Sequence, residues 1–223
     1  ATGLAIVAVI IIARYLPNDR SATGRQKDQK KLAAFDKRIR GLLMCSVCAF
    51  TGFAGIQQTL AFRLQDMLLL TGTETAQHMG ICLMVAALMT LTMQLTIAQR
   101  FQGAPVILLR IGVVLMLLGS LIVAAASSFA PILVGMASMG AGLGLAAPGI
   151  AAGASLAVTP QEQGSVAGLV TAFPAAGFVL GPVICGSLYT YDPTMSALSA
   201  SIMLLVALFI ALRGSRLRRR NRL

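Results

Sequence analysis

Two adjacent amide side chains, Gln57 and Gln58, lie inside an apolar run that also contains Phe50 and Phe53. A polar side chain inside a hydrocarbon layer needs a partner, so such an amide marks either a contact between helices or a ligand site. Amide groups beside aromatic rings suit an amphipathic organic molecule. Because neighbouring residues of a helix point about 100° apart, we expect only one amide to face a cavity. These four residues are therefore the first candidates for a small-molecule site, with interhelical hydrogen bonding as the alternative.

Two further side chains join this candidate site on the same reasoning. Gln94 lies four residues after Thr90, so the two share one face of the second apolar run. Phe173 stands directly before Pro174 in the fifth apolar run. Packing and hydrogen bonding between helices are again the alternative for each of them.

Titratable groups are absent from the middle of every apolar run. The seven acids and the single histidine lie in polar segments or at the ends of runs: Asp19, Asp28, Asp36, Asp66, Glu74, Glu162, Asp192 and His78. Proton coupling needs a titratable group inside the membrane, so a coupling acid would have to lie outside this chain. The sequence also shows no Ser-His-Asp set, no phosphate-binding loop after a strand and no cluster of metal ligands. We therefore expect no enzyme activity, no cofactor and no metal site.

Composition places most of the chain in a membrane. Of the 223 residues, 57% are hydrophobic and 11% are charged, whereas soluble domains are about half apolar and a quarter charged. The net charge of +11 could indicate nucleic-acid binding, but nine of the eighteen Lys and Arg residues fall between Arg14 and Arg40 and six between Arg213 and Arg222. Basic clusters beside apolar runs are typical of membrane proteins. We expect membrane lipid as a partner, and no nucleic acid.

Six transmembrane helices are the elements expected to position these residues. They correspond to apolar runs at residues 41–62, 78–98, 105–126, 129–157, 163–189 and 194–212. Residues 1–13 are apolar but shorter than the roughly 20 residues that a span requires, so we interpret them as the end of a preceding transmembrane helix. The predicted organisation continues with a basic loop at 14–40, a six-helix bundle at 41–212 and a basic tail at 213–223. Within the loop, the spacing of Leu32, Phe35 and Ile39 predicts a surface helix over 27–40.

The distribution of basic residues predicts the orientation. Six spans place residues 14–40 and 213–223 on the same side of the membrane, and seventeen Lys and Arg residues fall on that side against Arg63 alone on the other. The positive-inside rule then makes the loop and the tail cytoplasmic in a multi-pass protein of the plasma membrane. Arg110, inside the third run, is expected to extend back to the headgroups. Arg63 at the outer mouth would suit an organic anion, although a binding arginine is expected deeper.

Several helix starts carry recognisable capping residues. Thr159 and Glu162 flank Pro160 in the pattern of a capping box with proline at the first helical position. Asp192 precedes Pro193 in the same way, and Ser128 precedes the fourth run. These positions give Glu162 and Asp192 a structural role as helix caps.

Glycine and proline are concentrated in the fourth and fifth runs. Gly177 and Gly181 are four residues apart, so they share a helix face and allow close approach of a neighbouring helix. Pro182 removes a backbone hydrogen bond, and Pro148 does the same in the glycine-rich fourth run. The pattern predicts bent or mobile helices, with close packing of small residues as the alternative.

Three local motifs resemble the major facilitator superfamily, and within it the bacterial drug–proton antiporters with twelve helices. Residues 177–186 (GFVLGPVICG) follow the pattern G-x-x-x-G-P-x-x-G-G, ending at Gly186, with Cys185 in place of one glycine. Residues 98–105 (AQRFQGAP) are similar to the D-R-x-G-R-R loop, with Gln99 at the acidic position and Arg100 kept. Residues 62–66 (FRLQD) are similar to a stretch that follows the seventh helix of such transporters.

The resemblance implies a fold and a function for the chain. The fold would be an all-α membrane bundle of six helices in a three-plus-three inverted repeat, forming the C-terminal half of a transporter. The function would be export of drug-like or amphipathic small molecules by proton antiport across a bacterial inner membrane, with the coupling acid in the N-terminal half. Its glycine–proline motif would mediate conformational change. The alternatives are half of a metabolite or organic-anion symporter or facilitator, or a membrane subunit that does not transport.

Overall fold

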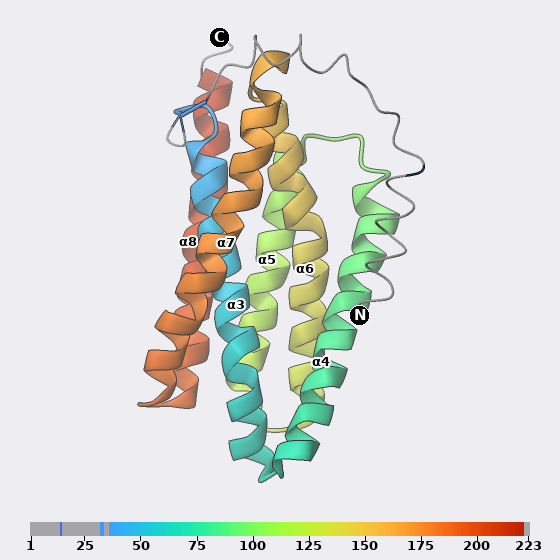
Figure 1. Cartoon of the computed structure of the whole chain (residues 1–223), viewed down its shortest axis with the longest axis vertical. Coiled ribbons are helices and arrows are strands. Elements are labelled where there is room, and N and C mark those ends of the chain that lie inside the picture. The colour runs from blue at the N-terminus through green and yellow to red at the C-terminus, as the bar shows by residue number, and fades with distance from the viewer. Residues whose placement is uncertain (1–13, 15–31, 34–35, 221–223) are drawn as a thin grey trace.

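The described residues of the computed structural model are helical or lie in short turns, with no strand among them (Figure 1). They comprise Arg14, residues 32–33 and residues 36–220. Residues 1–13, expected to end a preceding helix, lie outside them. Six described helices are long and apolar enough to cross a membrane. The prediction of an all-α, six-helix membrane bundle is therefore confirmed.

The helices run antiparallel in chain order and have these bounds: α3 (Arg40–Leu68), α4 (Gly72–Met93) with a π-helical continuation η2 (Gln94–Ala98), α5 (Pro105–Ala125), α6 (Phe129–Ser155), a 3-10 turn η3 (Pro160–Glu162), α7 (Gln163–Tyr189) and α8 (Pro193–Arg220). We call the end where α3 begins the connector end, and the end where α3 turns into α4 the far end. In Figure 1 the connector end is at the top and the far end at the bottom.

The first two helices extend beyond the predicted runs at the far end. The first run was expected to end at residue 62, but α3 continues to Leu68 because a helix can carry polar residues once it leaves the hydrocarbon layer. The second was expected to begin at His78, but α4 begins at Gly72. Thr71 and Glu74 form a complete capping box there, which satisfies backbone N–H groups before the apolar residues start.

Other predicted helix starts hold, with one exception. Thr159 and Glu162 form the expected capping box, and the carboxylate of Asp192 accepts hydrogen bonds from the backbone N–H groups of Thr194 and Met195. Thr194 thereby lowers the pKa of Asp192. Ser128 precedes α6 as expected but makes no capping hydrogen bond with its side chain.

The surface helix predicted over 27–40 is wrong where the chain is described. Residues 32–33 and 36 are not helical, residues 37–39 form a turn, and α3 begins at Arg40. Leu32 and Ile39 instead pack into a small apolar cluster with Leu43, Ala154 and Val166. Burial of these side chains against three helices replaces the expected contact with lipid.

Glycines determine how closely the helices pack. Gly112 and Gly119 of α5 each face α6 so closely that an added Cβ would lie 2.5 Å from the carbonyl oxygen of Gly142 or Gly135. On another face of α6, a Cβ at Gly144 would lie 2.5 Å from the carbonyl oxygen of Thr90 in α4. Small residues permit such backbone contact between membrane helices. The glycine-rich fourth run is therefore a packing helix with two partners.

Burial differs among the helices. In the most apolar stretch of each helix, 56% is buried inside the bundle for α3 and for α6, whereas the share is 11% for α4 and 17% for α7. A core cluster that includes Leu60, Leu109, Met116 and Met136 fills the bundle. The helices α4 and α7 thus lie at its margins, where much of their surface is available to lipid or to a partner.

Candidate functional site

The two central glutamines lie on the partly open side of α3. Gln57 is half-buried and Gln58 is exposed. Neither amide has a hydrogen-bond partner within the described part of the chain, whereas the adjacent Thr59 hydroxyl donates to the carbonyl oxygen of Gly55 at 2.9 Å. An amide inside a membrane span has no water to bind, so these two groups remain available to a ligand or to a second protein surface.

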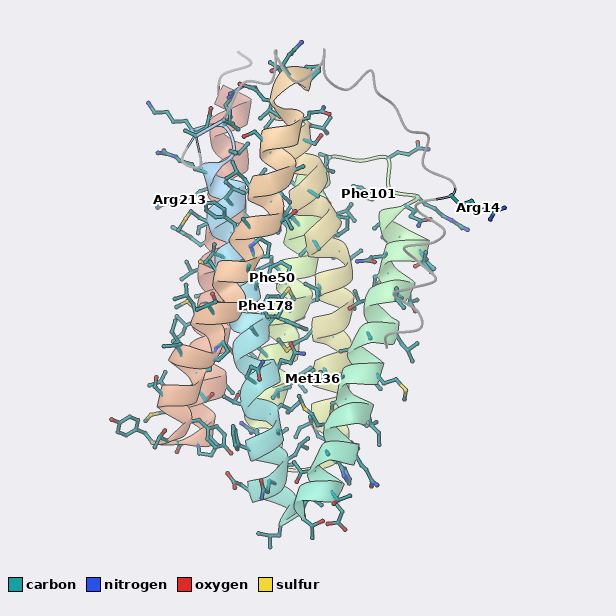
Figure 2. The ribbon with its side chains drawn as sticks, viewed as in Figure 1. Arg14, Phe50, Phe101, Met136, Phe178 and Arg213 are labelled. Atoms are coloured by element: carbon teal, nitrogen blue, oxygen red, sulfur yellow. The ribbon has the colours of Figure 1, made fainter. Side chains whose placement is uncertain are left out.

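The aromatic candidates of α3 occupy different environments. Phe53 is buried in the core, with 7% of its surface exposed. Phe50 is half-buried and faces α7, where its ring centroid lies 5.7 Å from that of Phe178 at an angle of 56° (Figure 2). Offset and tilted rings at this distance attract one another. Phe50 therefore helps to join α3 to α7, whereas Phe53 packs in the core of the bundle.

Gln94 and Phe173 lie on other helices. Gln94 begins the π-helical segment η2 at the connector end, where its backbone carbonyl accepts from the N–H of Gln99. Phe173, on α7, packs against the cluster of Ile39, Leu43, Ala154 and Val166 at the connector end. Thr90, which was predicted to share a helix face with Gln94, makes a direct contact between helices. Its hydroxyl donates to the carbonyl oxygen of Gly140 at 2.8 Å and so ties α4 to α6.

The glycine motif of α7 forms a seam with α3. A Cβ at Gly177 would lie 2.8 Å from the backbone N of Thr51, and one at Gly181 would lie 2.7 Å from the backbone N of Gly55. Gly186, by contrast, has no atom within 4 Å of the equivalent position. The first two glycines thus allow backbone contact, whereas Gly186 lies on the open side of the helix.

The prolines do not interrupt their helices. The helix α6 is continuous through Pro148, and α7 is continuous through Pro174 and Pro182. Neither helix therefore has a break at these prolines, and the predicted bend at Pro148 and Pro182 stays a prediction. Their predicted role in movement stays a prediction.

The loop between α4 and α5 is exposed at the connector end. Gln99 and Arg100 lie in the turn after η2, and both are exposed. Neither takes part in an ion pair within the described residues. Any role of this loop in conformational change stays a prediction.

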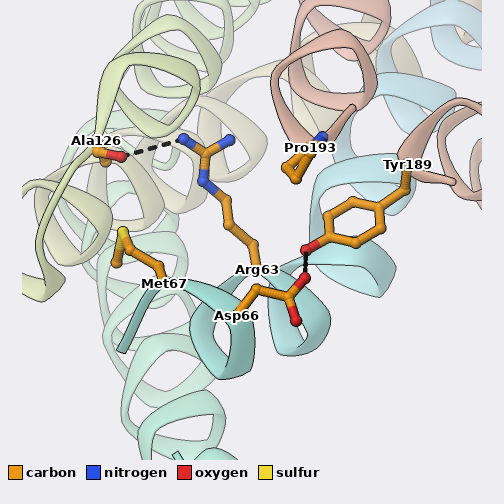
Figure 3. A pocket seen from close by; sticks show the side chains of 6 residues that line it. All are labelled: Arg63, Asp66, Met67, Ala126, Tyr189 and Pro193. Carbon is orange, nitrogen blue, oxygen red and sulfur yellow. Dashed lines mark hydrogen bonds between the residues drawn. The ribbon is translucent and has the colours of Figure 1, made fainter. Parts of the chain in front are cut away.

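A hollow of about 210 Å³ opens at the far end between α3, α5, α7 and α8 (Figure 3). Its lining comprises Arg63, Asp66, Met67, Ala126, Tyr189 and Pro193. The Tyr189 hydroxyl donates to the carboxylate of Asp66 at 2.6 Å. The Nη2 of Arg63 donates to the carbonyl oxygens of Ala124 (2.9 Å) and Ala126 (3.1 Å). Arg63 therefore binds the C-terminal carbonyls of α5, where a cation is favoured.

Arg110, inside α5, acts in a similar way at the connector end. Its Nε and Nη2 donate to the carbonyl oxygen of Ala211 in α8, at 3.2 and 3.1 Å. These bonds join α5 to α8, and the expected contact of Arg110 with lipid headgroups stays a prediction.

The described residues just before α3 (32–33 and 36–39), which we call the connector, are tied to the start of α7 through charged and polar groups. Arg38 donates from both terminal nitrogens to the carboxylate of Glu162, at 3.1 and 2.9 Å. It also binds Asp36 at 2.9 Å, and this hydrogen bond holds the pKa of Asp36 below its ordinary value. The backbone N–H of Leu32 donates to the hydroxyl of Ser165 at 3.0 Å. Leu32 and Arg38 thus connect the segment before α3 with the start of α7.

Sequence reasoning missed these end contacts because their partners are far apart along the chain. Asp66 and Tyr189 are separated by 123 residues, and Arg38 and Glu162 by 124. One available signal was a charged residue directly beside one apolar run together with an acid beside a later run. Such a signal indicates that a pair exists but does not identify its members.

The described helices form an antiparallel bundle of six membrane-length helices, with two largely open marginal helices and polar ties at both ends. Bundles of six helices also occur as the repeated units of some secondary transporters. No family model and no curated protein sequence matches the chain.

A solved structure shares this fold. The chain is similar to the human organic anion transporter MFSD10 (TETRAN), with a TM-score of 0.68 and 18% sequence identity over 78% of this chain and 40% of that one. The chain therefore spans about two fifths of the length of this neighbour. At this identity the likeness shows the fold alone, which is of the major facilitator type. It does not extend to the finer resemblance to bacterial drug–proton antiporters.

Proposed function

We propose that the chain is the C-terminal half of a secondary active transporter. The observation that carries this proposal is the major facilitator-like fold of the six helices, which covers 40% of a transporter of that type. In such a transporter a second six-helix half would cover the open surfaces of α4 and α7, and the solute would bind between the halves. The connector end, which is rich in Lys and Arg, would face the cytoplasm and the far end the outside.

Gln57 and Gln58 would contribute to the solute site. They lie in the middle part of α3, have no hydrogen-bond partner in the described chain, and are half-buried and exposed respectively. Phe50 stands two turns away on the same helix, at the contact with α7. An unpartnered amide beside an aromatic surface favours an amphipathic solute with at least one hydrogen-bonding group.

Export by proton antiport is the proposed mode of transport. Among the described spans, Asp and Glu occur only near helix ends, at Asp66, Glu74 and Glu162. A carboxylate that binds and releases the coupling proton in the membrane would therefore belong to the second half. The described half would then supply solute contacts and conformational change without taking up the proton itself.

Transport of an organic anion is the second candidate. It is favoured by Arg63, which lines the far-end hollow and forms no ion pair within the described residues. The structural neighbour MFSD10 is itself an organic anion transporter. The two candidates differ in solute charge, which can be measured directly.

The test uses the full-length protein in vesicles with an imposed pH gradient. Efflux of a lipophilic cationic dye (ethidium) and of an anionic dye (fluorescein) is measured for wild type, Gln57→Leu and Gln58→Leu. One of the two substitutions should weaken solute binding by roughly 1–2 kcal/mol, as expected for a lost hydrogen bond. The matched control is Gln65→Leu, an exposed amide of the same helix at the far end.

The outcomes separate the candidates. Ethidium efflux that depends on the pH gradient supports the antiporter, and transport of fluorescein alone supports the anion carrier. If both glutamine variants behave as Gln65→Leu does, the proposed solute site is wrong. If neither dye nor a wider panel of organic ions moves, the transport assignment itself fails.

A further inference from the structure

Arg63 and Asp66 are three residues apart on α3 and yet do not pair in the described structure. Side chains three residues apart on a helix are neighbours, so an arginine and an aspartate at this spacing can form an ion pair. Here Asp66 instead accepts a hydrogen bond from Tyr189 of α7, and Arg63 donates to the end of α5. Each of the two charges is thus engaged by a different helix.

The arrangement leaves one donor of Arg63 unused. Its Nη1 is buried and has no hydrogen-bond partner. A buried donor without an acceptor destabilises the conformation that leaves it so. A conformation in which Nη1 meets the Asp66 carboxylate would satisfy it, and that acceptor is on the same helix.

The surroundings provide room for this exchange. Arg63, Asp66 and Tyr189 line the same hollow of about 210 Å³ (Figure 3). Asp66 is exposed and Arg63 is half-buried, so rotation of two side chains suffices and the backbone of α3 need not move. Tyr189 is the last residue of α7, where a released hydroxyl can bind water at the end of the bundle.

We propose that Asp66 is a shared acceptor that exchanges between Tyr189 and Arg63, and that this exchange forms a two-position latch between α3 and α7 at the far end. In the docked position Asp66 holds Tyr189 and the ends of α3 and α7 are together. In the released position Asp66 holds Arg63, Tyr189 is free, and the ends can separate. The latch rests on the proposed function, because a transporter half needs its helix ends to move.

The two positions are close in free energy because each replaces one charge-assisted hydrogen bond by another. The docked position has the short Tyr189–Asp66 bond and a ring contact between Phe62 and Tyr189, with centroids 5.9 Å apart. The released position has the ion pair and satisfies Nη1. The seam at Gly177 and Gly181 lies nearer the middle of α7 and holds the helices together in both, so the ends separate about this seam. A small difference in solute binding is then enough to shift the population.

The experiment measures the distance between spin labels at Gln65→Cys and Thr190→Cys in the full-length protein, with its native cysteines replaced by alanine, in liposomes. Both labelled positions are exposed at the far end. Tyr189→Phe removes the hydroxyl and should raise the ratio of separated to docked molecules about threefold to tenfold. The matched control is Tyr191→Phe, an exposed tyrosine two residues further on, which should leave the ratio unchanged.

The decisive comparison is Arg63→Gln in the otherwise native chain. Glutamine can still donate to the α5 carbonyls but cannot form the ion pair of the released position, so the ratio of separated to docked molecules should fall about threefold to tenfold. Arg63→Lys retains the charge and should keep the ratio near that of the wild type, which also guards against misfolding of Arg63→Gln. An unchanged ratio in Arg63→Gln would show a fixed tie without exchange and overturn the latch, as would the absence of any effect of Tyr189→Phe.

The latch and the proposed function can fail separately. Exchange in the distance measurement without dye transport would retain the latch and refute the transporter assignment. Transport with no exchange would refute the latch and leave the transporter assignment standing.

Discussion

The α5–α6 seam and the α3–α7 seam both bring helix backbones together at glycines, but the contacts differ in extent. Along α5 and α6 the close contacts recur through most of the span, and glycines of both helices take part: Gly112, Gly119, Gly135, Gly142 and Gly149. The Ser138 hydroxyl adds a bond to the carbonyl oxygen of Leu115 at 2.8 Å. Backbone contacts therefore hold α5 to α6 along most of the seam.

Between α3 and α7 the backbones meet over a shorter stretch. Gly55, Gly177 and Gly181 form the close contact, and the two ends are held by side chains, through Tyr189 at one end and Arg38 at the other. Side-chain bonds can exchange partners, whereas a contact between backbones can only be kept or lost. The comparison teaches that α5 and α6 form a fixed pair, whereas α3 and α7 share one stretch of backbone contact and are otherwise held by side chains.

The largest expected effect is on the α5–α6 pair. A methyl group at Gly142 would meet the carbonyl oxygen of Gly112 and approach Met116 Cγ to 2.5 Å, and neither backbone can withdraw without opening the seam. Gly142→Ala should therefore lower the free energy of unfolding by about 3 kcal/mol, measured by thermal unfolding in detergent. Gly80→Ala, where no atom lies within 4 Å, is the control. A neutral Gly142→Ala would refute the idea of a fixed pair.

A smaller effect on stability, with a larger one on transport, is expected at the α3–α7 seam. A Cβ at Gly181 would lie 2.7 Å from the backbone N of Gly55 and from the carbonyl oxygen of Thr51. Gly181→Ala should cost about 1–3 kcal/mol and reduce dye efflux more than it reduces expression. Gly186→Ala in the same motif meets no atom within 4 Å and should leave both unchanged. Equal behaviour of the two variants would mean that the motif does not act through packing.

The smallest expected effect is at the connector end. Glu162→Gln removes the charge that binds Arg38, while glutamine can still complete the capping box with Thr159. Trypsin should then cleave near Arg38 about two- to threefold faster, because an exposed ion pair contributes little. High salt should accelerate cleavage of the wild type towards the rate of the variant by screening the pair. If salt accelerates both proteins equally, the ion pair does not hold the connector.

Much of the fold could be predicted from the sequence because the apolar runs are long. With η2 counted as part of α4, each of the six helices begins or ends within two residues of the prediction on at least one side. The capping box at Thr159 and Glu162 was identified from its pattern. The start of α4 was missed because the segment before His78 is polar, so hydropathy alone favoured a later start. The Thr71–Glu74 capping box there was a readable signal.

The candidate site could be predicted only in part. A pattern such as Gly177 and Gly181 indicates that some helix comes close, but only the packing shows that it is α3. The same holds for Arg63 and Arg110, whose partners are backbone carbonyls and therefore leave no mark in the sequence. Whether Gln57 and Gln58 bind a solute stays a prediction, because the packing of the described helices does not show what meets the two amides.

The two seams also differ in when they can be made during synthesis. Because α5 and α6 are consecutive and are joined by a short turn, residues 126–128, they can pair as a hairpin as soon as both have left the ribosome. The Tyr189–Asp66 contact spans 123 residues, which at about 5–20 residues per second corresponds to roughly 6–25 s of translation. During that interval Gly55 and the far end of α3 have no α7 to pack against. The Tyr189–Asp66 contact is thus among the last to form.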